Sequence, residues 1–246
     1  MCCRGLWLGT LLLCLFAAGP AHAHHLWVER GEEDYHVRRG LIPDRIDAFD
    51  PRHVTKIKAF DAQGLEFPVQ RTDGAKGVRV GLDQDPALIT VTCEWGHRVN
   101  TPVGKRFMSK QEALDHGVEV LSAFTSTQYS KTFFSIGDTW TLALGLPMEI
   151  VPLALPESLA PGEALPVKVL FNGSPLADSV IKSTLGHDDV KTDNNGLALI
   201  PLGKNGLHAI FATHTVSDQD KDDIDYRQHM TFIVFTLPCP HNKGTD

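Results

Sequence analysis

Short segments of alternating apolar and polar residues, separated by turn-forming residues, restrict this chain to a fold built mainly of β-strands. A strand points successive side chains to opposite faces, so a period of two is typical of a strand that packs one face on a core. Such segments are predicted at 26–30, 35–39, 54–61 and 88–95, and later at 165–171, 179–185, 197–202, 208–216 and 229–237. Asn-Gly-type turns lie between the later segments, as at Asn172-Gly173, Asn194-Asn195-Gly196 and Asn205-Gly206.

One short helix is predicted in the first half of the chain. Ser109 precedes Glu112 by three residues, which is the spacing of a capping box at a helix N-terminus. Apolar residues follow at helical spacing, namely Ala113, Leu114, Val118 and Leu121. Gly117 lies among them and weakens the helix without excluding it.

A cluster of prolines after residue 146 predicts a boundary within the chain. Prolines occur at 147, 152, 156, 161 and 166, and proline interrupts both helices and central strands. We therefore predict a β-rich N-terminal region with one short helix over 24–147 and a β-sandwich, Ig-like or prealbumin-like, over 148–238. Residues 239–246 are polar and are predicted to form a flexible tail. The sequence leaves open whether the two regions are separate domains.

Residues 1–23 have the pattern of a cleaved secretory signal peptide. Arg4 supplies a positive start, residues 6–18 form an apolar run, and Ala21-His22-Ala23 matches the small-x-small cleavage pattern. The run is too short to span a bilayer. The mature protein is therefore predicted to begin at His24, to be periplasmic or secreted, and to have no transmembrane anchor.

Export and charge restrict the partners further. Cys93 and Cys239 remain after signal cleavage, and in an oxidising compartment they form either one disulfide or two isolated thiols. The formal net charge of −7 makes the chain acidic, which argues against binding a nucleic acid backbone.

Several short motifs resemble one bacterial periplasmic family. They are MEIVPL at 148–153, VLFNGSPL at 169–176, TDNNG at 192–196, HHLWVE at 24–29, YSKT at 129–132, GLH at 206–208 and ATH at 212–214. The family has been described as a domain of unknown function, and some members are described as nickel or cobalt uptake accessory (substrate-binding) proteins. The resemblance implies a β-sandwich that handles a transition metal outside the cytoplasm.

Cleavage before His24 would place a free α-amine on a histidine and create a candidate metal site. The amine and the His24 imidazole can chelate one ion. Alternatively, the amine, the amide nitrogen of His25 and the His25 imidazole form a planar nitrogen set. Planar nitrogen favours Cu(II) or Ni(II), whereas a tetrahedral set would suit Zn(II). The predicted ligand is thus a transition metal ion, with nickel, cobalt or copper as candidates.

A further ligand has to come from another segment, because two histidines do not fill a coordination sphere. His208 and His214 share a face of one predicted strand but lie about 20 Å apart along it. His214 is the preferred closing ligand, since it lies near the strand end and at a position that matches the family. His229 is the alternative. If residues 217–225 form a hairpin loop, His214 and His229 fall nearly opposite each other.

No enzyme motif accompanies these histidines. The chain lacks a Gly-x-Ser-x-Gly elbow, a His-Glu-x-x-His helix and a phosphate-binding glycine loop. The acidic segment 218–225 lacks the glycine and glutamate that a calcium-binding EF-hand requires, so it is interpreted as a solvated hairpin tip.

The leading hypothesis is therefore a non-enzymatic periplasmic protein that binds a transition metal through the processed N-terminal histidines and passes it to a membrane transporter. An envelope β-sandwich that serves as a binding or structural module, with incidental histidines, is the alternative. A copper enzyme with an N-terminal histidine brace is the third hypothesis.

Overall fold

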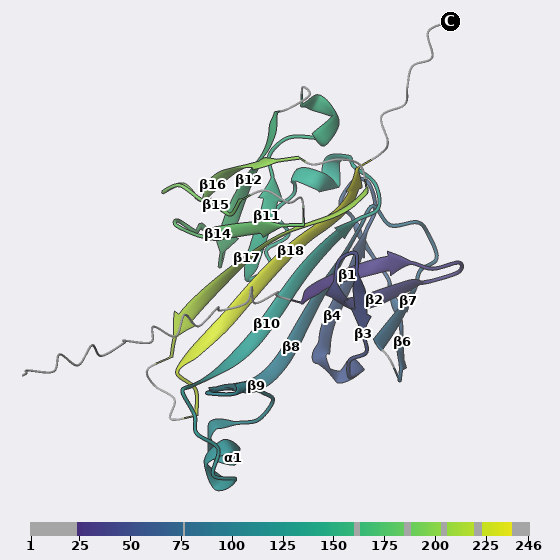
Figure 1. The fold of residues 1–246 in the computed structure, drawn as a ribbon. Coiled ribbons are helices and arrows are strands. Elements are labelled where there is room, and N and C mark those ends of the chain that lie inside the picture. The colour runs from purple at the N-terminus through teal and green to yellow at the C-terminus, as the bar shows by residue number, and fades with distance from the viewer. Residues whose placement is uncertain are drawn as a thin grey trace, which may run out of the picture.

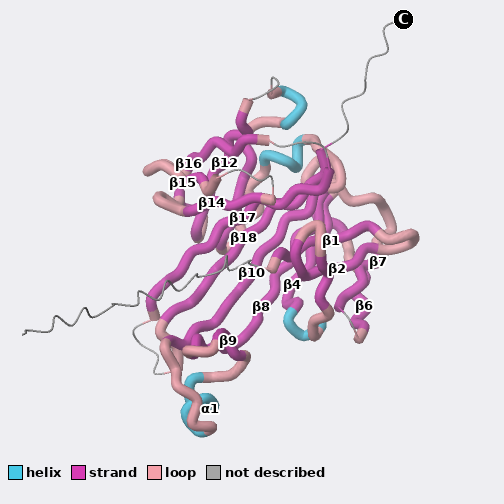
Figure 2. Tube along the Cα trace, viewed as in Figure 1, coloured by secondary structure: helices cyan, strands magenta, loops and turns pink. Residues whose placement is uncertain are grey.

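The computed structural model of the protein describes residues 24–75, 77–159, 163–184, 188–202, 206–218 and 223–237. The predicted signal peptide, the predicted tail and Cys239 lie outside these residues, as does the middle of the acidic segment. Within them the chain is mostly β, as the alternation predicts, and α-helix is confined to one short element (Figures 1 and 2).

The strands form three sheets. The five-stranded sheet contains β1 (His25–Arg30), β2 (Tyr35–Leu41), β3 (Arg45–Asp47), β6 (Gln70–Gly74) and β7 (Gly77–Gly81). The nine-stranded sheet contains β4 (Val54–Phe60), β5 (Glu66–Phe67), β8 (Leu88–Thr101), β9 (Gly104–Arg106), β10 (Ser122–Phe133), β14 (Val180–Ser183), β15 (Val190–Lys191), β17 (Gly206–Ser217) and β18 (Tyr226–Leu237). The four-stranded sheet contains β11 (Met148–Pro152), β12 (Ala164–Phe171), β13 (Ser174–Pro175) and β16 (Leu197–Pro201).

The nine-stranded sheet is the central layer. Its long strands β8, β10, β17 and β18 cross the middle of the molecule, with the four-stranded sheet on one side and the five-stranded sheet on the other (Figure 1). Alternate residues of β18 enter different cores: Phe232 packs in the first core, and Ile233 packs in the second. A strand covered on both faces has no polar side, which explains the continuous apolar run of β18.

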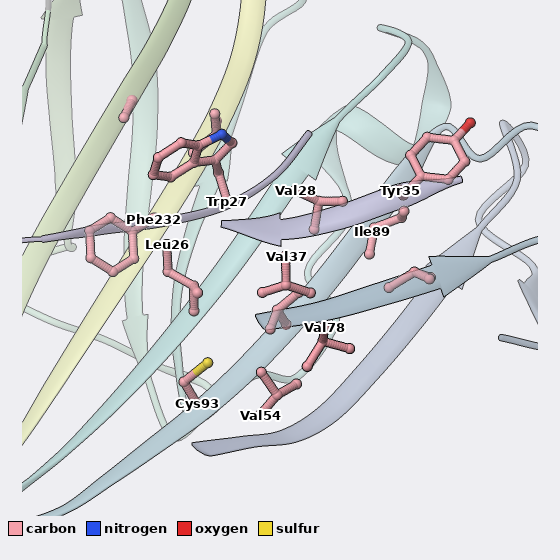
Figure 3. Close-up of a cluster of buried hydrophobic side chains, with 14 of the residues drawn as sticks. Leu26, Trp27, Val28, Tyr35, Val37, Val54, Val78, Ile89, Cys93 and Phe232 are labelled. Carbon is pink, nitrogen blue, oxygen red and sulfur yellow. The ribbon is translucent and has the colours of Figure 1, made fainter. Parts of the chain in front are cut away.

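Two hydrophobic cores hold the three layers together. The first lies between the five-stranded sheet and the central sheet, and Figure 3 shows Leu26, Val37 and Cys93 within it. The second lies between the central sheet and the four-stranded sheet and includes Trp140 and Ile150, which are fully buried. The layers around this second core form a β-sandwich, which agrees with the predicted fold class. Strands β4, β8 and β10, from the first predicted region, also contribute residues to this core.

The central sheet contains strands from both sides of the proline-rich segment. β10 pairs with β18 in parallel, with Phe124 opposite Tyr226 and Thr132 opposite Val234. Residues 24–147 and 148–238 thus share one continuous sheet. The prolines mark the place where the chain leaves the central sheet and enters the four-stranded one.

A buried ion pair joins the central sheet to the four-stranded sheet. Lys131 of β10 and Glu149 of β11 are 2.6 Å apart, with side chains 0% and 1% exposed. The ammonium also donates to the carbonyls of Leu142 and Ile150, and the carboxylate accepts from the backbone N–H groups of residues 144 and 145. Burial lowers the pKa of Lys131, and these bonds compensate both charges.

The helix α1 (Lys110–Asp115) begins where the capping box predicts. The Ser109 hydroxyl accepts from the N–H of Glu112 at 3.0 Å. The helix is shorter than the apolar spacing suggests, because Gly117 adopts a φ of 65° directly after it. A left-handed glycine at this place ends helices, and Val118 then donates to the Ala113 carbonyl across the end.

Cys93 is a fully buried thiol on β8 with no disulfide partner among the described residues, and Cys239 lies outside them. Burial raises its pKa to about 12, so the thiol stays protonated at neutral pH and is unsuited to nucleophilic or metal-binding chemistry. Within the described ranges, no helix combines the length and the apolar character needed to cross a bilayer.

The buried ion pair yields a stability prediction. Lys131→Met leaves the Glu149 carboxylate buried without its cation, so we expect the free energy of unfolding to fall by about 3–5 kcal/mol in urea titrations. The double variant Lys131→Met/Glu149→Gln removes both charges and should lose less. Lys58→Met is the control, because Lys58 pairs with Glu66 on the surface and should cost only about 0–1 kcal/mol. A double variant less stable than Lys131→Met would contradict this account.

Candidate functional site

The hairpin of β17 and β18 places two histidines side by side. His214 and His229 are direct partners in the antiparallel register, as the hairpin hypothesis predicts. The Cβ atoms of such partners lie about 4.5–5.5 Å apart, close enough for both imidazoles to reach one ion. The connecting loop covers 218–225, and its ends are held by ion pairs that join Asp218 to Arg227 and Asp223 to His97.

Aromatic side chains surround this pair on the face that carries the four-stranded sheet. The Phe171 ring lies 4.6 Å from the His214 ring and 5.1 Å from the His229 ring, centroid to centroid. The Tyr129 ring is nearly parallel to His229, and its hydroxyl oxygen lies 3.2 Å from Nδ1 of His229. Both imidazoles are half-buried in this setting.

The surroundings keep both imidazoles neutral. Burial lowers the pKa of His214. Burial also lowers the pKa of His229, and the nearby His214 and Arg227 lower it further. Neutral imidazole is the form that binds metal ions, so protons compete little at neutral pH.

The Tyr129 contact also orients His229. When Nδ1–H of His229 donates to the tyrosine oxygen, the lone pair of Nε2 remains available, and such an outer contact is typical of metal-binding histidines. Burial and the Glu94 charge raise the pKa of Tyr129 to about 12, so its hydroxyl stays protonated. Among the residues that the structure describes, Nε2 of His229 has no hydrogen-bond partner.

His24 and His25 lie on the opposite face of the central sheet. The His25 ring packs 5.0 Å from Phe211 of β17 and 6.2 Å from Phe232 of β18. Phe211 and His214 are three residues apart on the same strand, so their side chains point to opposite faces of the sheet. The structure therefore separates the two N-terminal histidines from the cross-strand pair by the thickness of a sheet, and the four predicted ligands do not converge.

His25 has a structural role in this arrangement. Its side chain is buried, and Nδ1 accepts from the backbone N–H of Ile42 at 3.0 Å. This bond and the two phenylalanine contacts hold β1 on the central sheet. The imidazole is thus engaged where a metal ligand would have to be accessible.

His24 is partly exposed beside mixed charges. Its Nε2 lies 3.0 Å from the Asp47 carboxylate and 3.0 Å from the Arg45 guanidinium. Burial lowers its pKa, and the charge of Arg39 lowers it further. A carboxylate is close enough to assist a metal ion there, but the two arginines oppose a second positive charge.

No group of three or more His, Cys, Asp or Glu side chains is arranged to hold a metal within the described ranges. The pair His214–His229 is a two-ligand arrangement, and water or a small molecule would have to complete the sphere of a bound ion. Tyr129 and Phe171 were not predicted as part of this site. Only the pairing of β10 with β18 and the packing of the four-stranded sheet bring them to it.

The position of His25 yields a second stability prediction. His25→Ala removes a packed ring and leaves the Ile42 N–H without its acceptor, so we expect a loss of about 2–4 kcal/mol in the free energy of unfolding of the metal-free protein. His24→Ala is the matched control and should cost at most about 1 kcal/mol, since that side chain is partly exposed. Equal losses for the two variants would refute a structural role particular to His25.

A family model described as a domain of unknown function (DUF4198) matches residues 21–216 of the chain. The match contains His24, His25 and His214 and ends before His229. No curated protein and no solved structure matches the chain significantly.

Proposed function

The chain belongs to the DUF4198 family, whose function is unknown. From the geometry of its histidines we propose that it binds a divalent transition-metal ion outside the cytoplasm. Ni(II), Co(II) or Cu(II) is the proposed cargo. The observation that carries the proposal is the direct cross-strand register of His214 and His229.

Three features of this pair support metal binding. The two imidazoles are neutral at physiological pH, since burial lowers the pKa of each. Imidazole nitrogen suits nickel, copper and cobalt better than it suits magnesium or calcium. The Tyr129 oxygen can accept the Nδ1–H of His229 and so direct the other nitrogen to the ion.

A two-histidine site is suited to a carrier. Because only two protein ligands hold the ion, its remaining positions stay open to water or to the ligands of another protein. Such an ion can be passed on by stepwise ligand exchange. We therefore propose that the protein is a non-enzymatic accessory to metal uptake that delivers the ion to a membrane transporter.

The processed N-terminus is the competing location within the same proposal. Cleavage before His24 would add an amine next to the imidazole and the Asp47 carboxylate. The positive charges of Arg39 and Arg45 disfavour a cation there, and His25 is engaged in packing. These contacts favour the cross-strand pair.

Calorimetric titration of Ni(II), Co(II) and Cu(II) into the exported protein tests the proposal. We expect one ion per chain, and we expect His214→Ala and His229→Ala each to weaken binding at least tenfold, which is about 1.4 kcal/mol. His116→Ala is the control, because His116 is the exposed C-cap of α1 and its imidazole contacts the Glu112 carbonyl rather than either histidine of the pair. It should leave the affinity unchanged.

A protein with one extra residue before His24 separates the two locations. Weaker binding in the extended protein, with no effect of His214→Ala, would move the site to the N-terminus. Weak metal binding whose affinity is the same in the extended protein and in both histidine variants would favour the alternative of an envelope binding or structural module.

A further inference from the structure

The face of the central sheet opposite His214 and His229 contains a cavity with an unusual charge. Its volume is about 490 Å³, within the range of small-molecule sites. Four cationic side chains from four strands line it, and no aspartate or glutamate does so among the described residues: Arg39 of β2, Arg98 of β8, Lys105 of β9 and Lys182 of β14. This local positive charge is opposite in sign to the formal net charge of the chain, which is −7.

Arg98 is the least compensated of these cations. Its Nε atom is buried and has no hydrogen-bond partner, and within the described ranges Arg98 forms no ion pair. Its guanidinium lies 3.9 Å from the centre of the Phe107 ring and 6.0 Å from that of Trp95. Burial and the charge of Arg39 lower the pKa of Arg98 to about 10, so it remains charged at neutral pH.

Arg39 is also poorly neutralised. Its Nε atom is likewise buried without a hydrogen-bond partner, and its guanidinium lies over Trp95 at 4.6 Å. The nearest carboxylate among the described residues is that of Asp47, at 4.0 Å. That carboxylate already contacts Arg45 at 2.9 Å and His24 at 3.0 Å, so little of its charge is left for Arg39.

A β-bulge builds this arrangement into the strand. Thr125 and Thr127 of β10 pair with His97 and Glu94 of β8, so β8 carries one more residue than its partner between these pairs. The extra residue turns Trp95 and Arg98 to the same face, where strict alternation would oppose them. Gly96 adopts a φ of 67° within the bulge, a conformation that favours glycine.

Hydrogen-bonding groups complete the lining. Ser126 of β10, Thr213 of β17 and Gln228 of β18 contribute hydroxyl and amide groups. Gln128 is held in place, since it accepts from the Trp95 indole N–H at 2.9 Å and donates to the His24 carbonyl at 3.3 Å. The walls therefore come from paired strands, which position side chains more rigidly than loops do.

We propose that this cavity binds a small organic anion that carries two or more carboxylate or phosphate groups. Buried cations are costly unless they are paired, and the planar guanidinium forks of two arginines match the oxygens of such groups. Lys105 at the edge of the cavity would meet a second anionic group, whereas Lys182 already pairs with Asp189 at 3.0 Å. The site is independent of the His214–His229 pair, because it lies on the other face of the sheet. His24, the competing metal location, lines this same cavity.

Titration of citrate and, separately, of inorganic phosphate into metal-free exported protein tests the proposal. We expect one-to-one binding of at least one of the two, with a change in tryptophan fluorescence that Trp95→Phe abolishes. Tighter binding of citrate would assign the site to carboxylates, and tighter binding of phosphate would assign it to phosphorylated compounds. Acetate carries a single charge and should bind at least tenfold more weakly than the preferred anion.

Arg98→Gln should weaken the preferred anion at least tenfold. Lys105→Gln should weaken it about threefold, and it keeps the test valid if Arg98→Gln fails to fold, because Lys105 is exposed. Arg79→Gln is the control, since Arg79 lies on β7 away from the cavity. Absence of binding by citrate and phosphate, or equal affinity in the lysine and control variants, would overturn the proposal. His214→Ala should leave anion binding intact, and a loss there would contradict two separate sites.

Discussion

The parallel pairing of β10 with β18 is the interaction on which the rest of the structure depends. It joins strands separated by nearly one hundred residues and makes one sheet from the two predicted regions of the chain. Parallel neighbours require a long connection, and here that connection forms the whole four-stranded sheet. The pairing places Thr127 and Tyr129 beside His229 on one face, and it places Ser126 and Gln128 beside the cationic cavity on the other.

The central sheet separates two chemically opposite environments. One face presents two neutral imidazoles with aromatic neighbours, which suit a cation. The other presents the half-buried guanidinium groups of Arg39 and Arg98 near Trp95, which suit an anion. A strand can supply both because successive side chains alternate between its faces. A bound cation and a bound anion would therefore not compete, because the sheet lies between the histidine pair and the arginines.

The candidate metal site was predictable only in part. His214 and His229 could be placed opposite each other from the sequence, because a hairpin relates its strands by a local count of residues. The N-terminal histidines could not be placed, because nothing local shows which face β1 covers. The structure uses His25 to pack between Phe211 and Phe232. The cationic cavity gave no sequence signal, since arginines and lysines in strands usually face solvent.

The mostly β fold, the start of α1 and the acidic balance of the chain follow from the sequence alone, because each depends on residues close together or on composition. The sequence placed His214 nearly opposite His229 only on the assumption of a hairpin loop, and strand pairing fixed the register. Tertiary structure decided that both regions share one sheet, that His25 is buried and that Arg39 and Arg98 meet over Trp95. The physical reason is that such contacts depend on long-range strand pairing and on a bulge at Gly96. The energies of these long-range contacts come from packing and desolvation, and a local sequence pattern does not show which distant residues supply them.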